Sequence, residues 1–355
     1  MSDGSLSLGQ LGWRACYSNQ LTLEDLDRGQ VVRISSVHRS RIEALGEAGP
    51  VEVIATAAWH ADGSTPVAVG DWVLVEHGSC RLLRLLERQS VIRRLAAGEV
   101  QREQAIAANV DTAFVVTSCN ADFNLSRLER YLAVVLDAGV TPVIVLTKAD
   151  LCDEVDRYRD EAARVAGDAA VVAVDARDPK VHEALADWLG PGQAVVFIGS
   201  SGVGKSTLVN TLSGAACQAT QDIREDDARG RHTTTSRQLL PMPGGAWLID
   251  VPGMRELKIG AAQAGLSEAF GDLETLARSC RFRDCGHGED VGCALREAVE
   301  AGGLDPRRLD NFLKLQREAA RAAQAEYVKR ATIRRTGRIH KKMHRERETE
   351  RRGRP

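Results

Sequence analysis

The chain lacks the features of a membrane or exported protein. No apolar run approaches the roughly 20 residues that a membrane-spanning helix needs. The first ten residues are small and polar, without the basic stretch and following apolar stretch of a secretory signal peptide. There is also no internal repeat. We therefore expect a cytoplasmic monomer with no membrane partner.

The chain also lacks the cysteine pattern of a disulfide framework. Five of its eight cysteines stand singly, mostly among apolar neighbours, and such cysteines in a cytosolic protein are typically reduced core residues. These five are Cys16, Cys80, Cys119, Cys152 and Cys217. The other three cluster in the C-terminal third and need a separate explanation.

Net charge is small, at −2, but it is unevenly distributed. Residues 329–355 contain twelve Lys and Arg against three Asp and Glu, a local charge of +9 that leaves about −11 for the remainder. A basic tail on an acidic body is typical of an arm that binds a polyanion such as RNA. A solvated helix or solubility tail is the alternative.

Residues 29–98 consist of short strand-like runs separated by glycine, proline and polar turns. This spacing favours a small all-β barrel, with an OB-fold as the leading candidate and a generic β-domain without a ligand as the alternative. No stripe of interleaved aromatic residues indicates nucleic-acid binding by this barrel. Residues 1–28 lack periodicity, which predicts a flexible leader. The strand-like runs are 31–34, 51–55, 67–75 and 81–86.

Residues 99–258 change to an alternation of strands and helices. Near-continuous apolar runs, typical of buried parallel strands in an α/β domain, alternate with helical patterns such as 125–136 and 155–165. Ligands of such sheets bind beyond the carboxyl ends of the strands, and the nucleotide motifs of this chain each follow a strand-like run. The runs are 113–116, 143–146, 171–174, 195–198 and 247–249.

The segment after residue 198 matches the phosphate-binding loop pattern G-x-x-x-x-G-K-[ST] without a mismatch. Glycines let its backbone N–H groups face the phosphates, and the following helix adds its dipole. Lys205 supplies positive charge to the β- and γ-phosphates, and Ser206 offers a hydroxyl to Mg²⁺. The loop residues are Gly199, Ser200, Ser201, Gly202, Val203, Gly204, Lys205 and Ser206.

Two further segments have the pattern of the γ-phosphate sensors of GTPases. Asp250 ends an apolar run and is suited to hold Mg²⁺, and the N–H of Gly253 is suited to the γ-phosphate. A threonine run lies between this segment and the phosphate loop, and we expect Thr234, with Thr235 next, to engage Mg²⁺ and the γ-phosphate. For the threonine run, a merely solvated loop is the alternative.

Met254 stands where many GTPases place a glutamine that orients the attacking water. Because methionine cannot orient water, the chain must use another group, hydrolyse slowly or receive help from a partner. His232, beside the threonine run, is the best local candidate, since a neutral imidazole accepts a hydrogen bond from water. A surface histidine without a role is the alternative.

A guanine-reading segment precedes the phosphate loop, although such a segment usually comes after it. The tetrapeptide Thr-Lys-Ala-Asp at 147–150 stands directly after a strand-like run. The carboxylate of Asp150 is suited to accept from guanine N1–H and N2–H, a donor pattern that adenine lacks, while the stem of Lys148 covers the base. Thr147 stands where asparagine is commoner.

A second base-binding loop lies after the next strand-like run. There the N–H of Ala176 is suited to guanine O6, and Asp175 replaces the usual serine. All five elements of a GTP site are then present, in the order base, base, phosphate, switch, switch. A parallel sheet tolerates this circular permutation because its binding loops share one edge. The second switch ends the domain, so we expect loss of the γ-phosphate to move the cysteine-bearing segment that comes next in the chain.

Residues 259–328 are helical around a cluster of metal-ligating residues. The spacing Cys-x4-Cys-x-His-x5-Cys offers three thiolates and one imidazole, which suit tetrahedral Zn²⁺ and leave no open position for catalysis. Reduced cysteines beside an unrelated histidine are the alternative. We expect one structural zinc ion, held by Cys280, Cys285, His287 and Cys293.

The barrel, the permuted GTPase domain and the Cys3His segment, in this order, resemble one family closely. This is the bacterial ribosome small subunit-dependent GTPase A, a circularly permuted GTPase of 30S subunit biogenesis. The resemblance covers about residues 30–320 and rests on TKAD, GSSGVGKS, GRHTTT, DVPG and the Cys/His spacing. It implies an OB-fold, GTP hydrolysis to GDP and phosphate stimulated by the 30S subunit, and late small-subunit maturation with contacts to 16S rRNA.

The same resemblance implies roles for individual residues. Lys148 and Asp150 match the guanine-binding residues, Gly199 to Thr207 match the phosphate-binding residues, and the four Cys and His residues match the zinc ligands. A hydrophobic residue at position 254 is expected in that family, and the histidine at 232 is a suspected catalytic group. We therefore assign Lys205 and His232 to catalysis.

Two other classes of protein remain open on the sequence. A metabolic ATPase or kinase shares the phosphate loop but would use ATP robustly. An RNA-binding scaffold with a regulatory, non-catalytic guanine-nucleotide site would keep its cellular function when Lys205→Ala abolishes turnover. Five motifs at strand ends favour the GTPase.

Overall fold

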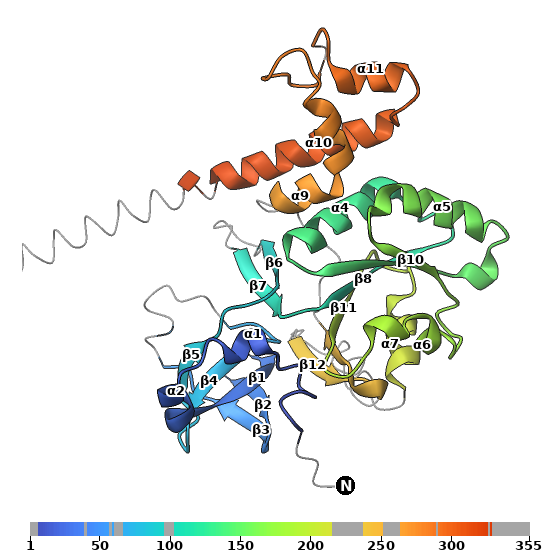
Figure 1. The fold of residues 1–355 in the computed structure, drawn as a ribbon. Helices are drawn as coiled ribbons and strands as arrows, with labels where there is room; N and C mark the ends of the chain where they lie inside the picture. The colour runs from blue at the N-terminus through green and yellow to red at the C-terminus, as the bar shows by residue number, and fades with distance from the viewer. Residues whose placement is uncertain are drawn as a thin grey trace, which may run out of the picture. The chain divides into compact units, whose positions relative to one another are not determined.

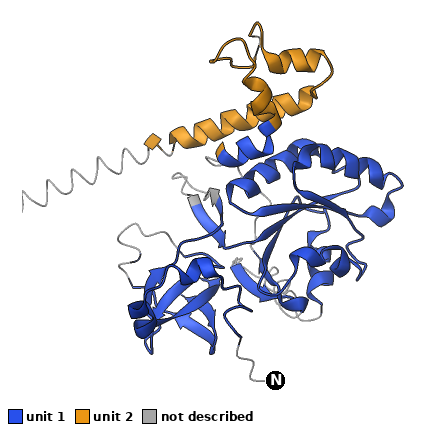
Figure 2. Cartoon of the chain, in the orientation of Figure 1, with its two compact units in different colours: residues 1–258, 264–271 blue, residues 259–263, 272–355 orange. Residues whose placement is uncertain are grey.

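The structure is a computed structural model, shown in Figure 1. The chain divides into two compact units, residues 1–258 with 264–271, and residues 259–263 with 272–355 (Figure 2). Within the described ranges, no helix has the length and apolar character needed to cross a membrane. The structure describes residues 6–38, 41–56, 59, 67–95, 103–214, 237–250, 263–288, 290–325 and 327–328.

The first unit begins with a small barrel whose strands are β1 (Gly29–Val37), β2 (Ile42–Gly46), β3 (Gly49–Val53), β4 (Trp72–Glu76) and β5 (Leu82–Leu85). Hydrogen-bonded pairing runs in the order β3-β2-β1-β4-β5. A parallel bridge between Ile54 and Arg81 joins the end of β3 to the start of β5 and closes the ring. The closed order 1-2-3-5-4-1 is that of an OB-fold, so the predicted barrel is confirmed.

The core of the barrel reflects the alternation of its strands. Val32 and Ile34 of β1, Val73 and Val75 of β4, and Ala44 of β2 are buried together in one apolar cluster. Four of the five strands correspond to runs expected from the sequence. The exception is β2, which mixes apolar residues with glutamate and glycine, so its sequence carries little alternation.

The expectation of a flexible leader is corrected for residues 6–28. This segment contains α1 (Ala15–Ser18) and α2 (Leu23–Arg28), and a capping box formed by Thr22 and Asp25 begins α2. Its aromatic rings pack on the barrel, with the Trp13 ring 4.8 Å from that of Trp72. Burial of a few large side chains orders the segment without any periodic pattern in its sequence.

Buried Arg33 ties this segment to the rest of the unit. The guanidinium donates to the carbonyl of Leu11 at 2.5 Å and to that of Asn109 at 3.2 Å, and lies 5.7 Å from the Trp72 ring centroid. Burial lowers the pKa of Arg33 to about 10, which still leaves it charged at neutral pH. One cation therefore links the leader, β1 and the entry to the next domain.

The nucleotide domain is built on a sheet in the order β10-β9-β8-β11-β13-β12. All neighbours pair in parallel except β12, which runs antiparallel to β13. The predicted parallel α/β sheet is confirmed. Its strands are β8 (Thr112–Ser118), β9 (Thr141–Thr147), β10 (Ala170–Ala173), β11 (Ala194–Ile198), β12 (Arg237–Pro241) and β13 (Trp247–Asp250).

Helices cover both faces of this sheet (Figure 1). On one face, side chains that alternate along the strands, such as Phe114, Val145 and Phe197, pack with Leu208 and Leu212 of α7 (Lys205–Ser213). Helix α6 (Val181–Ala184) joins the same cluster. On the other face, α4 (Leu125–Asp137) and α5 (Val155–Ala166) contact β8, β9 and β10. The strand ends are thus held in register for the binding loops.

Barrel and nucleotide domain share one continuous sheet. Strand β12 pairs antiparallel with β1 of the barrel, with Ser36 opposite Gln238 and Val37 opposite Arg237. The resulting sheet has 11 strands. In the sequence, a separate hairpin of β6 (Val91–Leu95) and β7 (Glu103–Ala108) lies between the barrel and the nucleotide domain. The sequence did not predict β12, which contains a proline and joins two parts far apart along the chain.

The second unit is helical, as expected. Besides part of α10 (Gly271–Ala277) it contains α11 (Ala294–Glu300) and a long helix over 306–325. Asp305 caps the long helix by accepting the N–H of Arg307 at 2.8 Å, and Pro306 occupies its first turn. Leu295, Phe312 and Leu315 are among its buried apolar residues.

The described cysteines are free thiols, as expected for reduced residues. Of the four singly placed cysteines that the structure describes, Cys119 is buried, whereas Cys16, Cys80 and Cys152 are half-buried. The expectation of core positions therefore holds for Cys119 alone among these four. Cys217 lies outside the described residues.

Candidate nucleotide and metal sites

The phosphate loop connects β11 to α7, and two of its glycines are required by geometry. Gly199 lies so close to β8 that a Cβ there would be 2.2 Å from the carbonyl oxygen of Val116. Gly204 precedes α7 with φ +93°, a left-handed conformation that favours glycine. The loop therefore curls tightly at the carboxyl end of β11, with the first turn of α7 directly behind it.

Lys205 and Ser206 occupy that first turn. The Nζ of Lys205 donates to the carbonyl of Gly199 at 2.8 Å and to that of Ser200, so the ammonium lies against the loop that it is expected to serve. Ser206 and Thr207 are exposed, which leaves their hydroxyls accessible to a metal ion or phosphate. This arrangement is suited to the binding of a polyphosphate.

The end of β9 is hydrogen-bonded directly to the phosphate loop. Fully buried Thr147 places its Oγ1 2.5 Å from the carbonyl oxygen of Val203 and 3.1 Å from that of Thr117. The next residue, Lys148, has φ +58° and donates from Nζ to the carbonyl of Gly202 at 2.9 Å. Segments 54 to 56 positions apart in the chain therefore form one site.

The two carboxylates of the expected base-binding loops are bridged by an arginine that the sequence did not predict. Arg177 donates from Nη2 to Asp150 Oδ2 at 2.7 Å, and its Nε lies 3.4 Å from Asp175 Oδ1. Hydrogen bonds to Asp175 and to Asp150 raise the pKa of Arg177 above its ordinary value. The sequence places a basic residue directly after Asp175 and Ala176. Nothing in the sequence indicates that this residue contacts Asp150, which lies 27 positions away.

Asp250 ends β13, which pairs in parallel with β11. It therefore lies on the sheet edge where the phosphate loop begins. Of the expected Mg²⁺ ligands, the structure thus describes Ser206 on α7 and Asp250 on β13. The remaining expected site residues lie outside the described ranges: His232, Thr234, Thr235, Gly253 and Met254.

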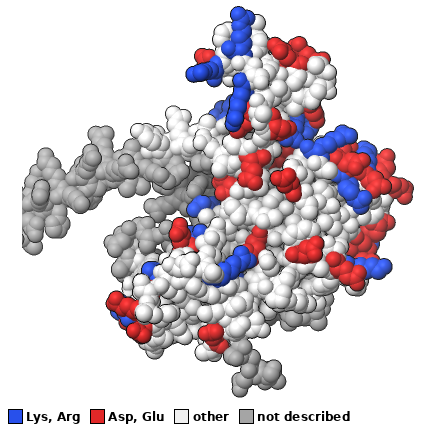
Figure 3. Space-filling view, in the orientation of Figure 1, with Lys and Arg blue, Asp and Glu red and all other residues white. Residues whose placement is uncertain are grey.

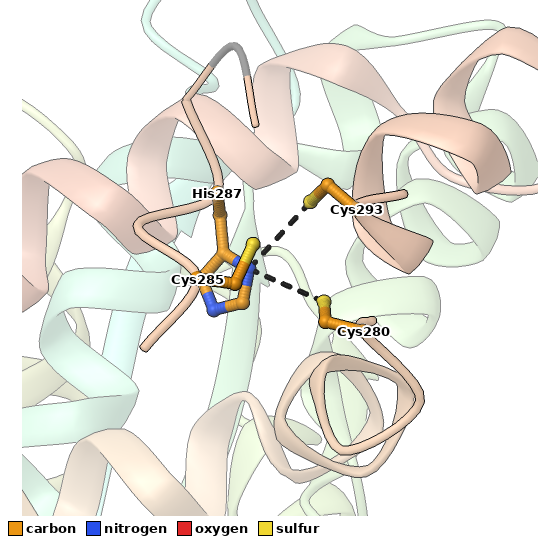
Figure 4. Close-up of side chains that lie close together, drawn as sticks. All are labelled: Cys280, Cys285, His287 and Cys293. Carbon is orange, nitrogen blue, oxygen red and sulfur yellow. Dashed lines mark hydrogen bonds between the residues drawn. The ribbon is translucent and has the colours of Figure 1, made fainter. Parts of the chain in front are cut away.

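The four expected metal ligands converge in the second unit (Figure 4). Their ligand atoms all lie within 4.8 Å of one another, and the His287 Nδ1 is 3.6 Å from each of the Cys280 and Cys293 sulfurs. Positive φ at His287 and Gly292 turns the chain around the cluster. Three sulfurs and one imidazole nitrogen this close together could hold a metal ion, and this donor set suits tetrahedral coordination. The fourth ligand is Cys285.

Sheet order and motif order together define the class of the first unit. The strand that leads into the phosphate loop lies in the middle of the sheet, but β9 and β10, which lead into the expected base-binding loops, precede it in the chain. This is the arrangement of a circularly permuted P-loop GTPase. A family model described as RsgA GTPase matches residues 85–260. The chain belongs to the RsgA GTPase family, because it also shares 46% and 48% identity with two members of that family over 90% or more of its length.

Similar proteins cover most of the chain. The "Small ribosomal subunit biogenesis GTPase RsgA 2" of Vibrio vulnificus is 46% identical over 340 residues, 96% of each chain. The "Small ribosomal subunit biogenesis GTPase RsgA" of Mesorhizobium japonicum is 48% identical over 322 residues, covering 90% of this chain and 91% of that one.

Two solved structures share the fold. YjeQ from Thermotoga maritima aligns with a TM-score of 0.61 at 23% identity, over 82% of this chain and 99% of that chain. YloQ, described as a circularly permuted GTPase, aligns with a TM-score of 0.58 at 24% identity, over 82% of this chain and 95% of that chain. The recognition of a permuted GTPase fold from the sequence is therefore confirmed.

Proposed function

We propose that this chain hydrolyses GTP to GDP and phosphate on the small (30S) ribosomal subunit and acts late in the maturation of that subunit. The observation that supports this most is the pair of hydrogen bonds from Thr147 and Lys148 to the phosphate loop. They hold a guanine-reading segment and a phosphate-binding loop in one site. Family membership supports the ribosomal role.

Guanine recognition is proposed to rest on the loops after β9 and β10. The carboxylate of Asp150 accepts from N1–H and N2–H, the stem of Lys148 covers the base, and the N–H of Ala176 meets O6. Ala149, between them, has its N–H directed to the carbonyl of Val174 at 3.4 Å, which links the two loops. Asp175 then acts by holding Arg177 and the turn of the second loop.

Hydrolysis is proposed to use the first turn of α7 and the two switch segments. Lys205 neutralises charge on the β- and γ-phosphates, and Ser206, Thr234 and Asp250 hold Mg²⁺. Mg²⁺ when bound supplies further positive charge to the phosphates. The N–H of Gly253 is assigned to the γ-phosphate. His232 is proposed to accept a hydrogen bond from the attacking water, because Met254 cannot orient it.

The Cys3His cluster is proposed to hold one structural zinc ion. Four protein ligands leave no coordination position for a reacting group, so the ion stabilises the second unit and takes no part in hydrolysis. The cluster joins the segment after α10 to the start of α11, where Cys293 is the N-cap residue. In a helical unit with a small core, such a link between elements contributes to folding.

The second unit is proposed to contact 16S rRNA through the loop of the metal cluster. Phe282 is 51% exposed there, and the guanidinium of Arg281 lies 5.5 Å from its ring centroid. Arg278 and Arg283 are also exposed, and Figure 3 shows basic side chains at this end of the unit. Exposed aromatic and arginine side chains stack on unpaired RNA bases, and the basic tail at 329–355 suits phosphates.

The proposed function is tested by GTP turnover with and without purified 30S subunits, at two salt concentrations. Controls are ATP in place of GTP and 50S in place of 30S. A large stimulation specific to 30S and GTP is expected, because Met254 stands where many GTPases place the residue that orients the water, so the isolated protein should hydrolyse GTP slowly. Equal turnover with and without 30S would reject ribosome stimulation, and robust ATP use would reject the guanine assignment.

Replacement of Asp150 and Lys205 separates the enzyme from a scaffold. Asp150→Asn should lose the preference for guanine, because an amide N–H meets the donors of the base. Lys205→Ala should abolish turnover and, in cells, the function that depends on it. Full function in cells without turnover would favour an RNA-binding scaffold with a regulatory nucleotide site. A cytoplasmic monomer is compatible with both the enzyme and the scaffold.

A further inference from the structure

Asp150, Arg177 and Asp175 form an ion-pair cluster at the base-binding edge of the sheet. Arg177 Nη2 is 2.7 Å from Asp150 Oδ2, and its Nε is 3.4 Å from Asp175 Oδ1. The Arg177 side chain is 65% exposed, whereas those of Asp150 and Asp175 are 25% and 29% exposed. The cation thus lies on the solvent side of two partly sheltered carboxylates.

Asp175 also holds the backbone of Arg177. Its Oδ1 also accepts the backbone N–H of Arg177 at 2.9 Å, which closes a short turn after β10. The turn places the guanidinium toward Asp150, on the neighbouring loop. Because two carboxylates of like charge flank the guanidinium, its departure from Asp150 would still leave it paired with Asp175.

The donors of arginine and guanine are chemically alike. In guanine, N1–H, C2 and the N2 amino group form a guanidine fragment that presents parallel N–H donors. Arginine presents the same planar fork to a carboxylate. An aspartate suited to one is therefore suited to the other, and the Oδ2 that accepts from Arg177 belongs to the carboxylate proposed to read the base.

We propose that Arg177 competes with guanine for the Asp150 carboxylate and thereby sets the affinity of the site for guanine nucleotides. The inference rests on the proposed function in one respect, namely that Asp150 reads the base. Guanine displaces the guanidinium from Asp150 Oδ2, and Arg177 keeps its contacts with Asp175. The competition lowers affinity for GDP and GTP alike, because it acts on the base and not on the phosphates.

The expected effect is modest because the arginine is largely exposed. Removal of an ion pair of this kind changes an equilibrium by about 1.5- to 5-fold. Salt screens exposed charges, so the competition weakens as ionic strength rises. A neutral side chain at position 177 should therefore tighten nucleotide binding at low salt more than at high salt.

The test measures the Kd of GDP for the full chain by calorimetry and its dissociation rate with a fluorescent GDP, at low and high salt. Arg177→Met is compared with wild type and with Arg159→Met as the matched control. Arg159 forms an exposed ion pair with Asp156 at 2.9 Å within α5. We expect Arg177→Met to bind GDP about 2- to 5-fold more tightly at low salt. The gain should shrink at high salt, and Arg159→Met should match wild type.

Two outcomes would overturn the inference, and they are distinguishable. Unchanged or weaker GDP binding by Arg177→Met, in a protein whose Asp150→Asn variant loses guanine preference, rejects the competition and leaves the guanine assignment intact. An Asp150→Asn variant that keeps its guanine preference rejects the guanine assignment, and the competition with it. A melting temperature equal to wild type confirms that Arg177→Met is folded.

Discussion

The buried hydroxyl of Thr147 offers the sharpest test of how this nucleotide site is held together. Thr147→Val keeps the shape of the side chain and removes the hydroxyl that bonds the end of β9 to the phosphate loop. The hydroxyl lies 2.5 Å from the carbonyl oxygen of Val203 and 3.1 Å from that of Thr117, and its residue is fully buried. The substitution therefore leaves at least one buried carbonyl without its donor.

The lost hydrogen bond sets the magnitude of the effect. A hydrogen bond within a protein contributes about 0.5–1.5 kcal/mol net, and a buried polar group left without a partner costs about 1–3 kcal/mol. We expect the free energy of unfolding of the nucleotide-bound protein to fall by about 1–2 kcal/mol. In a unit of this size, that corresponds to a melting temperature lower by roughly 2–8 °C.

The assay is thermal melting at saturating GDP, together with the Kd of GDP. Melting at saturation captures the whole loss, whether it falls on folding or on ordering of the loop. Thr141→Val is the matched control, because it makes the same chemical change at the exposed start of the same strand. Surface substitutions usually change stability by less than about 0.5 kcal/mol. If both variants melt together and bind GDP equally, the hydroxyl does not hold the loop.

Three further predictions concern stability, the thiols and the metal. Arg88→Met should lower the melting temperature strongly, by the equivalent of about 3–5 kcal/mol, because it removes the partner of the fully buried Asp71 carboxylate. Two nitrogens of Arg88 lie 2.7 Å from that carboxylate. A shift in melting temperature under about 2 °C would contradict this prediction. Burial raises the pKa of Cys119 to about 11, so its native thiol should resist iodoacetamide at pH 8, as measured by mass spectrometry against the denatured chain. The same shift means that this thiol's contribution to stability is fully present below the ordinary pKa of 9.0 and is lost as pH rises toward 11. Cys285→Ser should unfold the second unit without abolishing GDP binding by the first, as followed by proteolysis and calorimetry; an unchanged proteolysis pattern would count against a structural metal.

Much of the candidate site could be predicted from the sequence, because it depends on the local spacing of residues. The phosphate loop, the four metal ligands and the apolar strands are encoded within short segments, because loop curvature, tetrahedral coordination and burial of a strand each depend on neighbours along the chain. The Thr-Lys-Ala-Asp segment was also predicted to bind guanine, since it stands after an apolar run and ends in a carboxylate suited to the N–H donors of that base. The carboxyl ends of parallel strands then had to share one edge.

Tertiary structure decided the features that depend on distant partners. The pairing of β12 with β1, the packing of Trp13 on Trp72 and the contact of Arg177 with Asp150 each join segments whose sequences contain no sign of one another. Arg177 is one of 47 Lys and Arg residues, and only the juxtaposition of two loops selects it as a partner of the Asp150 carboxylate. The motifs determined the chemistry of this chain, whereas packing between distant strands determined which charges meet at the site.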